Sequence, residues 1–164
     1  GYSGGGNALI ARFEAEGAPA YRAYGYDMAH KHRPEMKLHA GLRHGVIFAP
    51  AVVPAYRGMV VEVPLHLGAM PGDPSADRLH AALCDFYASS AIVAVSDMAA
   101  QSELLLERSA PPRDSMTLHV FGNEGGWHAR LVAVLDNLGK GASGAAIQNL
   151  NIMCGLPETT GLRL

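Results

Sequence analysis

Two apolar segments in the C-terminal half of the chain constrain the fold more than any other feature. The segments "MTLHVFGN" (116–123) and "HARLVAVLDN" (128–137) are separated by the short "EGGW". Apolar runs that flank a glycine-containing turn of this length are typical of a β-hairpin. A hairpin makes the sheet at least partly antiparallel. The sequence therefore predicts an α+β fold rather than a doubly wound parallel one.

The other apolar segments predict further strands and helices. Pro64, inside one predicted strand, favours an edge position or a bulge there. Helices are predicted where apolar residues recur at helical spacing after a capping residue or a proline. The predicted strands are 21–26, 44–50, 57–67 and 91–95, and the predicted helices are 7–16 capped by Asn7, a short one from Pro34, 76–88 after cap candidates Asp73–Ser75, and 142–153.

Composition limits the function classes. The 164 residues are 49% hydrophobic, which is enough for one domain covering 1–164 with a real core. A formal charge of −2 and a pI near 6.5 provide no basic surplus for nucleic acid, so no nucleic-acid partner is expected. No apolar run reaches the length of a membrane span. Cys84 and Cys154 form no CxxC pair or disulfide framework, which favours a reducing cytoplasm.

The segment "AHKHRPEM" (29–36) is the strongest candidate for proton chemistry. On an extended chain His30 and His32 point to opposite faces, so one metal ion bound by both is not favoured. One imidazole with Glu35 nearby would serve as a general acid or base. The alternative is a solvated turn with incidental histidines. The segment alone does not decide between them.

Two glycine-rich segments could approach a ligand closely. "GKGASG" (139–144) matches GxGxxG, but too few residues follow for a complete dinucleotide-binding unit. Tight packing of a helix on a strand explains its glycines equally well. "GYSGGG" (1–6) could cradle a phosphate or carboxylate, or be a flexible loop.

Arg57, between two apolar runs, could bind a carboxylate or lie on a surface turn. Both cysteines are predicted to fill the core, without an activating neighbour in sequence.

In their order along the chain, four segments resemble the N-acetyl-gamma-glutamyl-phosphate reductase family, in particular its shorter, type 2 branch. The His-Lys-His-x-Pro-Glu and "DNLGKGASGAAIQNLN" segments carry most of the resemblance, which covers essentially the whole chain. The four segments are "GYSGGGNALIARFE", "AYGYDMAHKHRPEM", "FAPAVVPAYRGMVVEVPL" and "VFGNEGGWHARLVAVLDNLGKGASGAAIQNLNIMCGLPETTGL".

The resemblance implies a two-domain, homo-oligomeric enzyme of arginine biosynthesis, a dimer or tetramer in the cytoplasm. An N-terminal NADP-binding Rossmann domain and a catalytic cysteine precede an α+β catalytic and dimerisation domain, with a mixed, largely antiparallel sheet and helices on one face. The cysteine attacks the acyl phosphate, phosphate leaves, and NADPH reduces the thioester to N-acetylglutamate 5-semialdehyde. Because this chain corresponds to the second domain, we expect the cysteine upstream of Gly1, and no turnover by the chain alone.

The resemblance also implies roles for individual residues. The acid/base histidine is His30 or His32, with His30 favoured and Glu35 orienting or tuning it; no metal site is expected. The substrate side is expected to comprise Ser3, Gly4, Gly5, Tyr24 and Arg57, and the nicotinamide side of NADP to face Asn137, Gly139 and Gly141.

Three alternatives stay open at this point. The chain could belong to an aspartate-semialdehyde-dehydrogenase-like relative, which shares the architecture with a differently arranged histidine segment. It could be a dimerisation module without a ligand pocket. A metal hydrolase built on His30, His32 and Glu35 is the least favoured.

Overall fold

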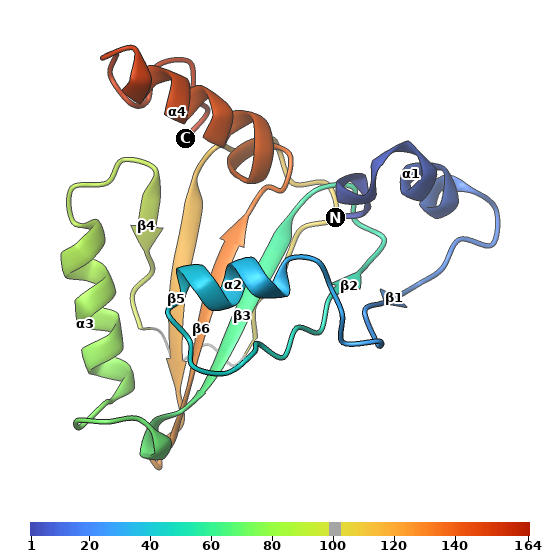
Figure 1. The fold of residues 1–164 in the computed structure, drawn as a ribbon. Helices are drawn as coiled ribbons and strands as arrows, with labels where there is room; N and C mark the ends of the chain where they lie inside the picture. The colour runs from blue at the N-terminus through green and yellow to red at the C-terminus, as the bar shows by residue number, and fades with distance from the viewer. Residues whose placement is uncertain (99–102) are drawn as a thin grey trace. The chain divides into compact units, whose positions relative to one another are not determined.

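The predicted hairpin forms the centre of the main sheet. The computed structural model describes residues 1–98 and 103–164, and β5 (Met116–Gly122) and β6 (His128–Leu135) pair antiparallel in it (Figure 1). β3 (Met59–His66) pairs antiparallel with the other edge of β6, and the short β4 (Val93–Val95) pairs parallel with β5. The order β3-β6-β5-β4 is a mixed, largely antiparallel sheet, which confirms the predicted α+β class.

Contacts along the chain divide it into two compact units, residues 1–54 and 55–164. The second unit contains the main sheet. Its helical elements are η2 (Leu67–Ala69), α3 (Ala76–Tyr87), the π-helical turn η3 (Gly139–Ser143) and α4 (Gly144–Met153). The first unit contains η1 (Tyr2–Gly5), α1 (Gly6–Glu14), β1 (Arg22–Ala23), α2 (Arg33–His39) and β2 (Ala51–Val52).

α3 packs on the sheet through a glycine. Gly122 at the end of β5 has no side chain, and a Cβ atom there would lie 2.6 Å from the Cβ atom of Ala76 at the start of α3. The helix begins where predicted, because the Ser75 hydroxyl accepts a hydrogen bond from the Arg78 N–H at 3.2 Å. Its other contacts are with β4 and β5, so α3 covers that half of one sheet face.

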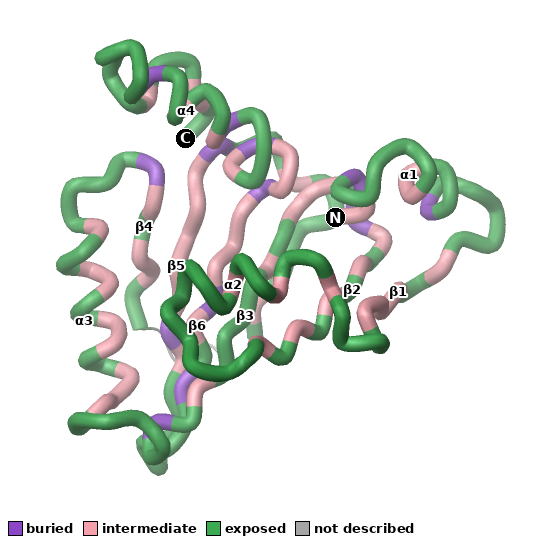
Figure 2. Tube along the Cα trace, viewed as in Figure 1, coloured by how far each residue is buried: buried purple, intermediate pink, exposed green. Residues whose placement is uncertain are grey.

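The core lies in the main sheet of the second unit. Figure 2 shows buried and half-buried positions concentrated along β5 and β6. The buried apolar residues of this unit are Ala55, Leu67, Ile92, Val120, Ala129 and Val132. In the first unit Phe13 is buried, with its ring stacked on that of Tyr2 at 5.3 Å. No helix in the described residues has the length and apolarity needed to cross a membrane.

Several predicted details are wrong in the first unit. α1 is capped by Gly5 without a side-chain hydrogen bond, so Asn7 lies inside the helix and does not cap it. Residues 44–50 form no strand, and the strand predicted at 21–26 shrinks to β1, whose two residues pair with the two of β2. An apolar run becomes a strand only when the edge of another strand is available to pair with it. Here only Arg22 and Ala23 of the first run are paired, with Val52 and Ala51.

Three features of the second unit test the predictions: the position of Pro64, the burial of the two cysteines and the end of α4. Pro64 lies in β3, an end strand of the sheet, so the predicted edge position is confirmed. Cys84 is half-buried on α3, but Cys154 is exposed just after α4, so its predicted place in the core is wrong. α4 ends as its sequence predicts, before Gly155, whose positive φ of 67° suits a glycine.

Candidate functional site

A tight turn places His30 beside the short β1–β2 sheet. Tyr24 follows β1, and its backbone N–H donates to the Pro50 carbonyl at 3.2 Å. The chain then reverses, with the Met28 N–H bonded to the Gly25 carbonyl at 3.0 Å. Met28 has a φ of 56°, a left-handed conformation that costs free energy in a residue other than glycine. The turn delivers His30 to the entrance of α2.

Three rings surround the half-buried imidazole of His30. The ring centroids of Phe48, His32 and Tyr24 lie 4.8, 5.0 and 5.9 Å from it. Its Nδ1 accepts a long hydrogen bond, 3.4 Å, from the His32 N–H. An accepting Nδ1 places the proton of the neutral ring on Nε2. With this contact, a neutral His30 ring would present its Nε2–H as a donor, and the ring lies next to that of Tyr24.

His32 and Glu35 are both exposed and lie at the start of α2. His32 is the N-cap residue of the helix, and Pro34 lies in its first turn. Glu35 also lies in the first turn, where a carboxylate stabilises the helix N-terminus. No hydrogen bond or ion pair in the described residues joins Glu35 to His30. The orienting role of Glu35 thus stays a prediction, with its place in the helix as a sufficient alternative reason.

The predicted Ser3–Gly5 cradle is a 3-10 turn at the entrance to α1. Ser3 is buried, whereas Gly4 and Gly5 are exposed. A Cβ atom on Gly5 would lie 2.2 Å from a methyl carbon of Leu9, so a glycine here lets the turn close on the helix. The remaining predicted site residues belong to the second unit.

In the second unit Arg57 is ion-paired to Asp136, which the sequence analysis did not single out. The Arg57 guanidinium lies 2.7 Å from Asp136 Oδ2, and the Asp136 side chain is 5% exposed. Burial alone raises the pKa of Asp136, but the N–H groups of Leu138 and Arg113 and the Arg57 guanidinium together hold it below its ordinary value. The carboxylate is therefore charged at neutral pH.

The predicted cofactor residues form the turn that follows Asp136. Asn137 is half-buried, and its side-chain oxygen accepts from the Gly58 N–H at 2.9 Å. Gly141 is exposed, and its N–H donates to the Asp136 carbonyl at 2.9 Å. Gly139 is buried, and a Cβ atom on it would lie 1.9 Å from the Arg113 carbonyl oxygen. Packing thus accounts for Gly139.

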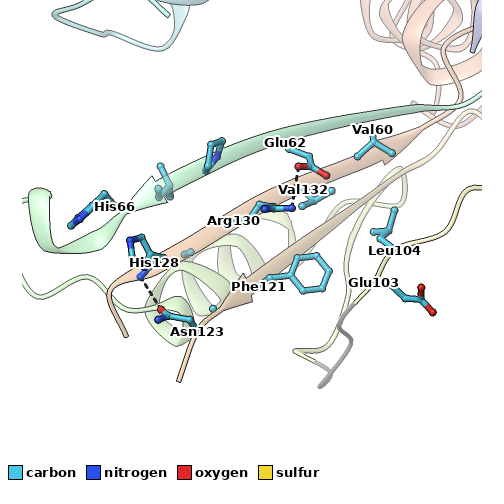
Figure 3. Close-up of a pocket in the computed structure, with 14 residues that line it drawn as sticks. Val60, Glu62, His66, Glu103, Leu104, Phe121, Asn123, His128, Arg130 and Val132 are labelled. Carbon is cyan, nitrogen blue, oxygen red and sulfur yellow. Dashed lines mark hydrogen bonds and ion pairs between the residues drawn. The ribbon is translucent and has the colours of Figure 1, made fainter. Parts of the chain in front are cut away.

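Several cavities lie along the described residues of the second unit. One, about 230 Å³, is lined by Arg57, Arg113, Glu107 and residues around them, and another, about 490 Å³, is lined by residues around Cys84 and Ile92. A third, about 930 Å³, is an open groove on the face of the sheet that carries Val60, Val132 and Phe121 (Figure 3). None of the predicted site residues lines this groove.

Histidines and one exposed ion pair give the groove its polar character. The rings of His66 and His128 lie 4.9 Å apart, and Glu62 pairs with Arg130 at 3.3 Å (Figure 3). A third histidine of the sheet, His119, does not line the groove; it is half-buried on β5 with its ring stacked near Phe121, and burial lowers its pKa. No three histidine, cysteine or acidic side chains of the described residues are grouped as a metal site.

A cysteine–histidine contact was also missed. The Cys84 sulfur lies 3.7–3.8 Å from the ring nitrogens of His80, whose Nε2 is 2.9 Å from the Ser96 carbonyl oxygen. His80 and Cys84 are four residues apart on α3, so helical spacing could have shown the pair. Asp136 gave no comparable signal, because Arg57 and Arg113 are far away from it in the sequence.

Comparison with known proteins identifies the family. A family model described as "Semialdehyde dehydrogenase, dimerisation domain" matches residues 1–137. An N-acetyl-gamma-glutamyl-phosphate reductase of Sinorhizobium fredii is 45% identical over 159 residues, 93% of this chain and 51% of the relative. The enzymes of that name from Brucella anthropi and Brucella ovis are each 44% identical over 162 residues, 94% of this chain and 52% of the relative. The chain spans about half the length of these relatives, and it belongs to the semialdehyde dehydrogenase dimerisation-domain family.

Proposed function

We propose that this chain is the catalytic and dimerisation part of an NADP-dependent N-acetyl-gamma-glutamyl-phosphate reductase. Its relatives of that name match it at 44–45% identity. The complete enzyme would convert N-acetyl-glutamyl 5-phosphate to N-acetylglutamate 5-semialdehyde through a thioester on a cysteine outside this chain. We propose a cytoplasmic homo-oligomer, a dimer or tetramer.

The arrangement around His30 supports the proposal most directly. The ring is half-buried among Tyr24, His32 and Phe48, and these contacts limit its orientation. The Nε2–H set by the Nδ1 contact can donate to an oxygen that gains negative charge while the acyl carbon is attacked and reduced. A positioned donor of this kind contributes about 10²–10⁴-fold to a rate.

The turn after β6 supports an approach of the cofactor. NADPH, when bound, supplies the hydride. Gly141 is exposed without a side chain and Asn137 is half-buried with a polar one, so the two fit a polar group that comes close to the backbone. We assign Asn137 and Gly141 to the cofactor side. Gly139 assists by letting the turn pack against Arg113.

The substrate side is assigned to Tyr24, Arg57 and the Ser3–Gly5 turn. Arg57 is 21% exposed, and one guanidinium nitrogen is used by Asp136. The guanidinium has further N–H groups, which would suit a substrate carboxylate. The exposed backbone of Gly4 and Gly5 suits the side where phosphate leaves.

The test uses the full-length protein that carries this chain. NADPH formation from N-acetylglutamate 5-semialdehyde, NADP and phosphate measures the reaction in reverse, with aspartate 4-semialdehyde as the competing substrate. We expect activity with the first substrate. Activity with aspartate 4-semialdehyde alone would instead identify a relative of the aspartate-semialdehyde enzyme.

Matched variants test the role of His30. We expect His30→Asn to lower kcat by about 10²–10⁴-fold. His39→Asn is the control, since His39 is exposed in the last turn of α2, and its turnover should stay close to that of the parent. Equal turnover of His30→Asn and the parent would contradict the proton-transfer role and favour a dimerisation module.

A further inference from the structure

Three segments that are distant in the sequence meet at one end of the main sheet. Because β6 runs antiparallel to β3 and β5, its end lies beside the beginnings of both neighbours. Arg57 and Gly58 precede β3, Arg113 precedes β5, and Asp136 begins the turn after β6. We call this set, with residues 137–141, the Asp136 corner.

The Asp136 carboxylate binds a donor from each of these segments. Its Oδ2 accepts from the Arg57 guanidinium at 2.7 Å and from the Arg113 N–H at 3.2 Å. Its Oδ1 accepts from the Leu138 N–H at 2.9 Å. Both oxygens are thus engaged on a side chain that is 5% exposed. Hydrogen bonds to a charged acceptor are stronger than neutral ones, so this carboxylate holds its neighbours firmly.

The backbone of the same turn is fastened at several further points. The Asp136 carbonyl accepts from the Gly141 N–H at 2.9 Å, and the Arg113 carbonyl accepts from the Lys140 N–H at 3.1 Å. The Asn137 side chain accepts from the Gly58 N–H at 2.9 Å. These bonds join the turn to the same neighbouring segments that the Asp136 side chain contacts.

We propose that Asp136 is a positioning residue, which fixes the cofactor-facing turn 137–141 and the Arg57 guanidinium in one geometry. The inference rests on the proposed function, in which Asn137 and Gly141 face the cofactor and Arg57 faces the substrate. In this assignment Asp136 acts through these groups and not on the reactants themselves. Its loss frees the turn and the guanidinium together, so recognition of both reactants weakens while His30, in the other unit, keeps its own contacts.

Asp136→Asn is the informative variant. An amide of the same size has one acceptor oxygen and one NH₂ group, so it cannot accept from Leu138 while also accepting from Arg57 and Arg113. Glu62→Gln is the matched control. It also removes a carboxylate charge that pairs with an arginine of this sheet, but Glu62 is exposed in the middle of β3.

The first measurement is hydrogen–deuterium exchange of the full-length protein, and it requires no activity. Asp136→Asn should speed exchange in residues 137–141 by at least about tenfold and leave the middle of β5 and β6 unchanged. Glu62→Gln should leave residues 137–141 as in the parent. Unchanged exchange in Asp136→Asn would overturn the inference.

The second measurement is steady-state kinetics of the same proteins. Asp136→Asn should raise the KM values for NADP and for the semialdehyde by about tenfold, with a smaller fall in kcat and the same pH profile of kcat. Faster exchange with unchanged KM values would overturn the positioning role. Faster exchange in a protein whose parent lacks reductase activity would instead refute the proposed function, and with it the role assigned to Asp136.

A second variant covers the case in which Asp136→Asn does not fold. Arg57→Gln removes one of the three donors and leaves the two backbone donors to the carboxylate in place. Exchange in 137–141 should then rise by a smaller factor than the tenfold expected for the full disruption. If Arg57→Gln exchanges at the parent rate, the inference fails.

Discussion

Replacing Gly139 by alanine should destabilise the second unit strongly. The new Cβ atom would lie 1.9 Å from the Arg113 carbonyl oxygen, 2.8 Å from its carbonyl carbon and 2.9 Å from Asp114 Oδ1. Ordinary contacts of carbon with oxygen or carbon are about 3.5 Å, so the turn and the Arg113 backbone must separate by about 1.5 Å.

The structure makes that separation costly. The Arg113 N–H is bonded to Asp136 and its carbonyl to the Lys140 N–H, so neither side of the contact moves without losing hydrogen bonds. Overpacking costs about 1–3 kcal/mol, and we expect the upper end, about 3 kcal/mol, for a contact between backbone atoms. Such a loss is a large part of the stability of an ordinary domain.

Gly141→Ala is the matched control in the same turn. Its Cβ atom would lie 3.3 Å from the Asp136 carbonyl oxygen, and the residue is exposed. The small crowding is offset by the lower entropy of the unfolded alanine chain, so the net change should be within about 0.5 kcal/mol. Urea unfolding followed by the fluorescence of Trp127, the single tryptophan, reports on this unit. If both variants unfold at the parent midpoint, the close packing of Gly139 is refuted.

Three further measurements test other parts of the second unit. The parent should have a larger free energy of unfolding than Asp136→Asn, and this difference should be complete above pH ~4 and decline as pH falls through the lowered pKa of Asp136. A difference in the free energy of unfolding that stays constant down to acid pH would contradict this. Burial lowers the pKa of His119, so the parent should gain stability relative to His119→Gln as pH rises toward about 6.5 and then level off. If the urea midpoints of the two proteins change with pH in parallel, this prediction is refuted. Asn151→Ala should cost about 1–3 kcal/mol, since the buried amide of Asn151 donates to the carbonyls of Glu158 and Thr160, and an unchanged thermal midpoint would exclude this.

The parts of the fold that depend on local patterns were predictable from the sequence. The hairpin of β5 and β6 follows from two apolar runs and a glycine turn, and α3 follows from its apolar spacing and the Ser75 cap. Residues 44–50 have the composition of a strand but form none, because composition does not show whether a partner edge is available.

The candidate site was predictable only in part, for the same reason. Tyr24 and His30 are close in sequence and are brought together as expected. Phe48 packs on His30 from eighteen residues further along, and the spacing of the segment does not show this. The Asp136 corner needs the pairing of β3, β6 and β5 before its donors can meet, so no window of the sequence contains it.

The proline in β3 affects how the protein behaves in concentrated solution. An end strand of eight residues with half-exposed valines could template cross-β stacking between molecules. Pro64, the sixth residue of β3, has no amide hydrogen, and a proline in an end strand is one of the features that oppose pairing with a further strand. At the opposite edge β4 offers three residues. Overexpression should therefore yield dispersed material, and Pro64→Val is the change that would favour fibrils.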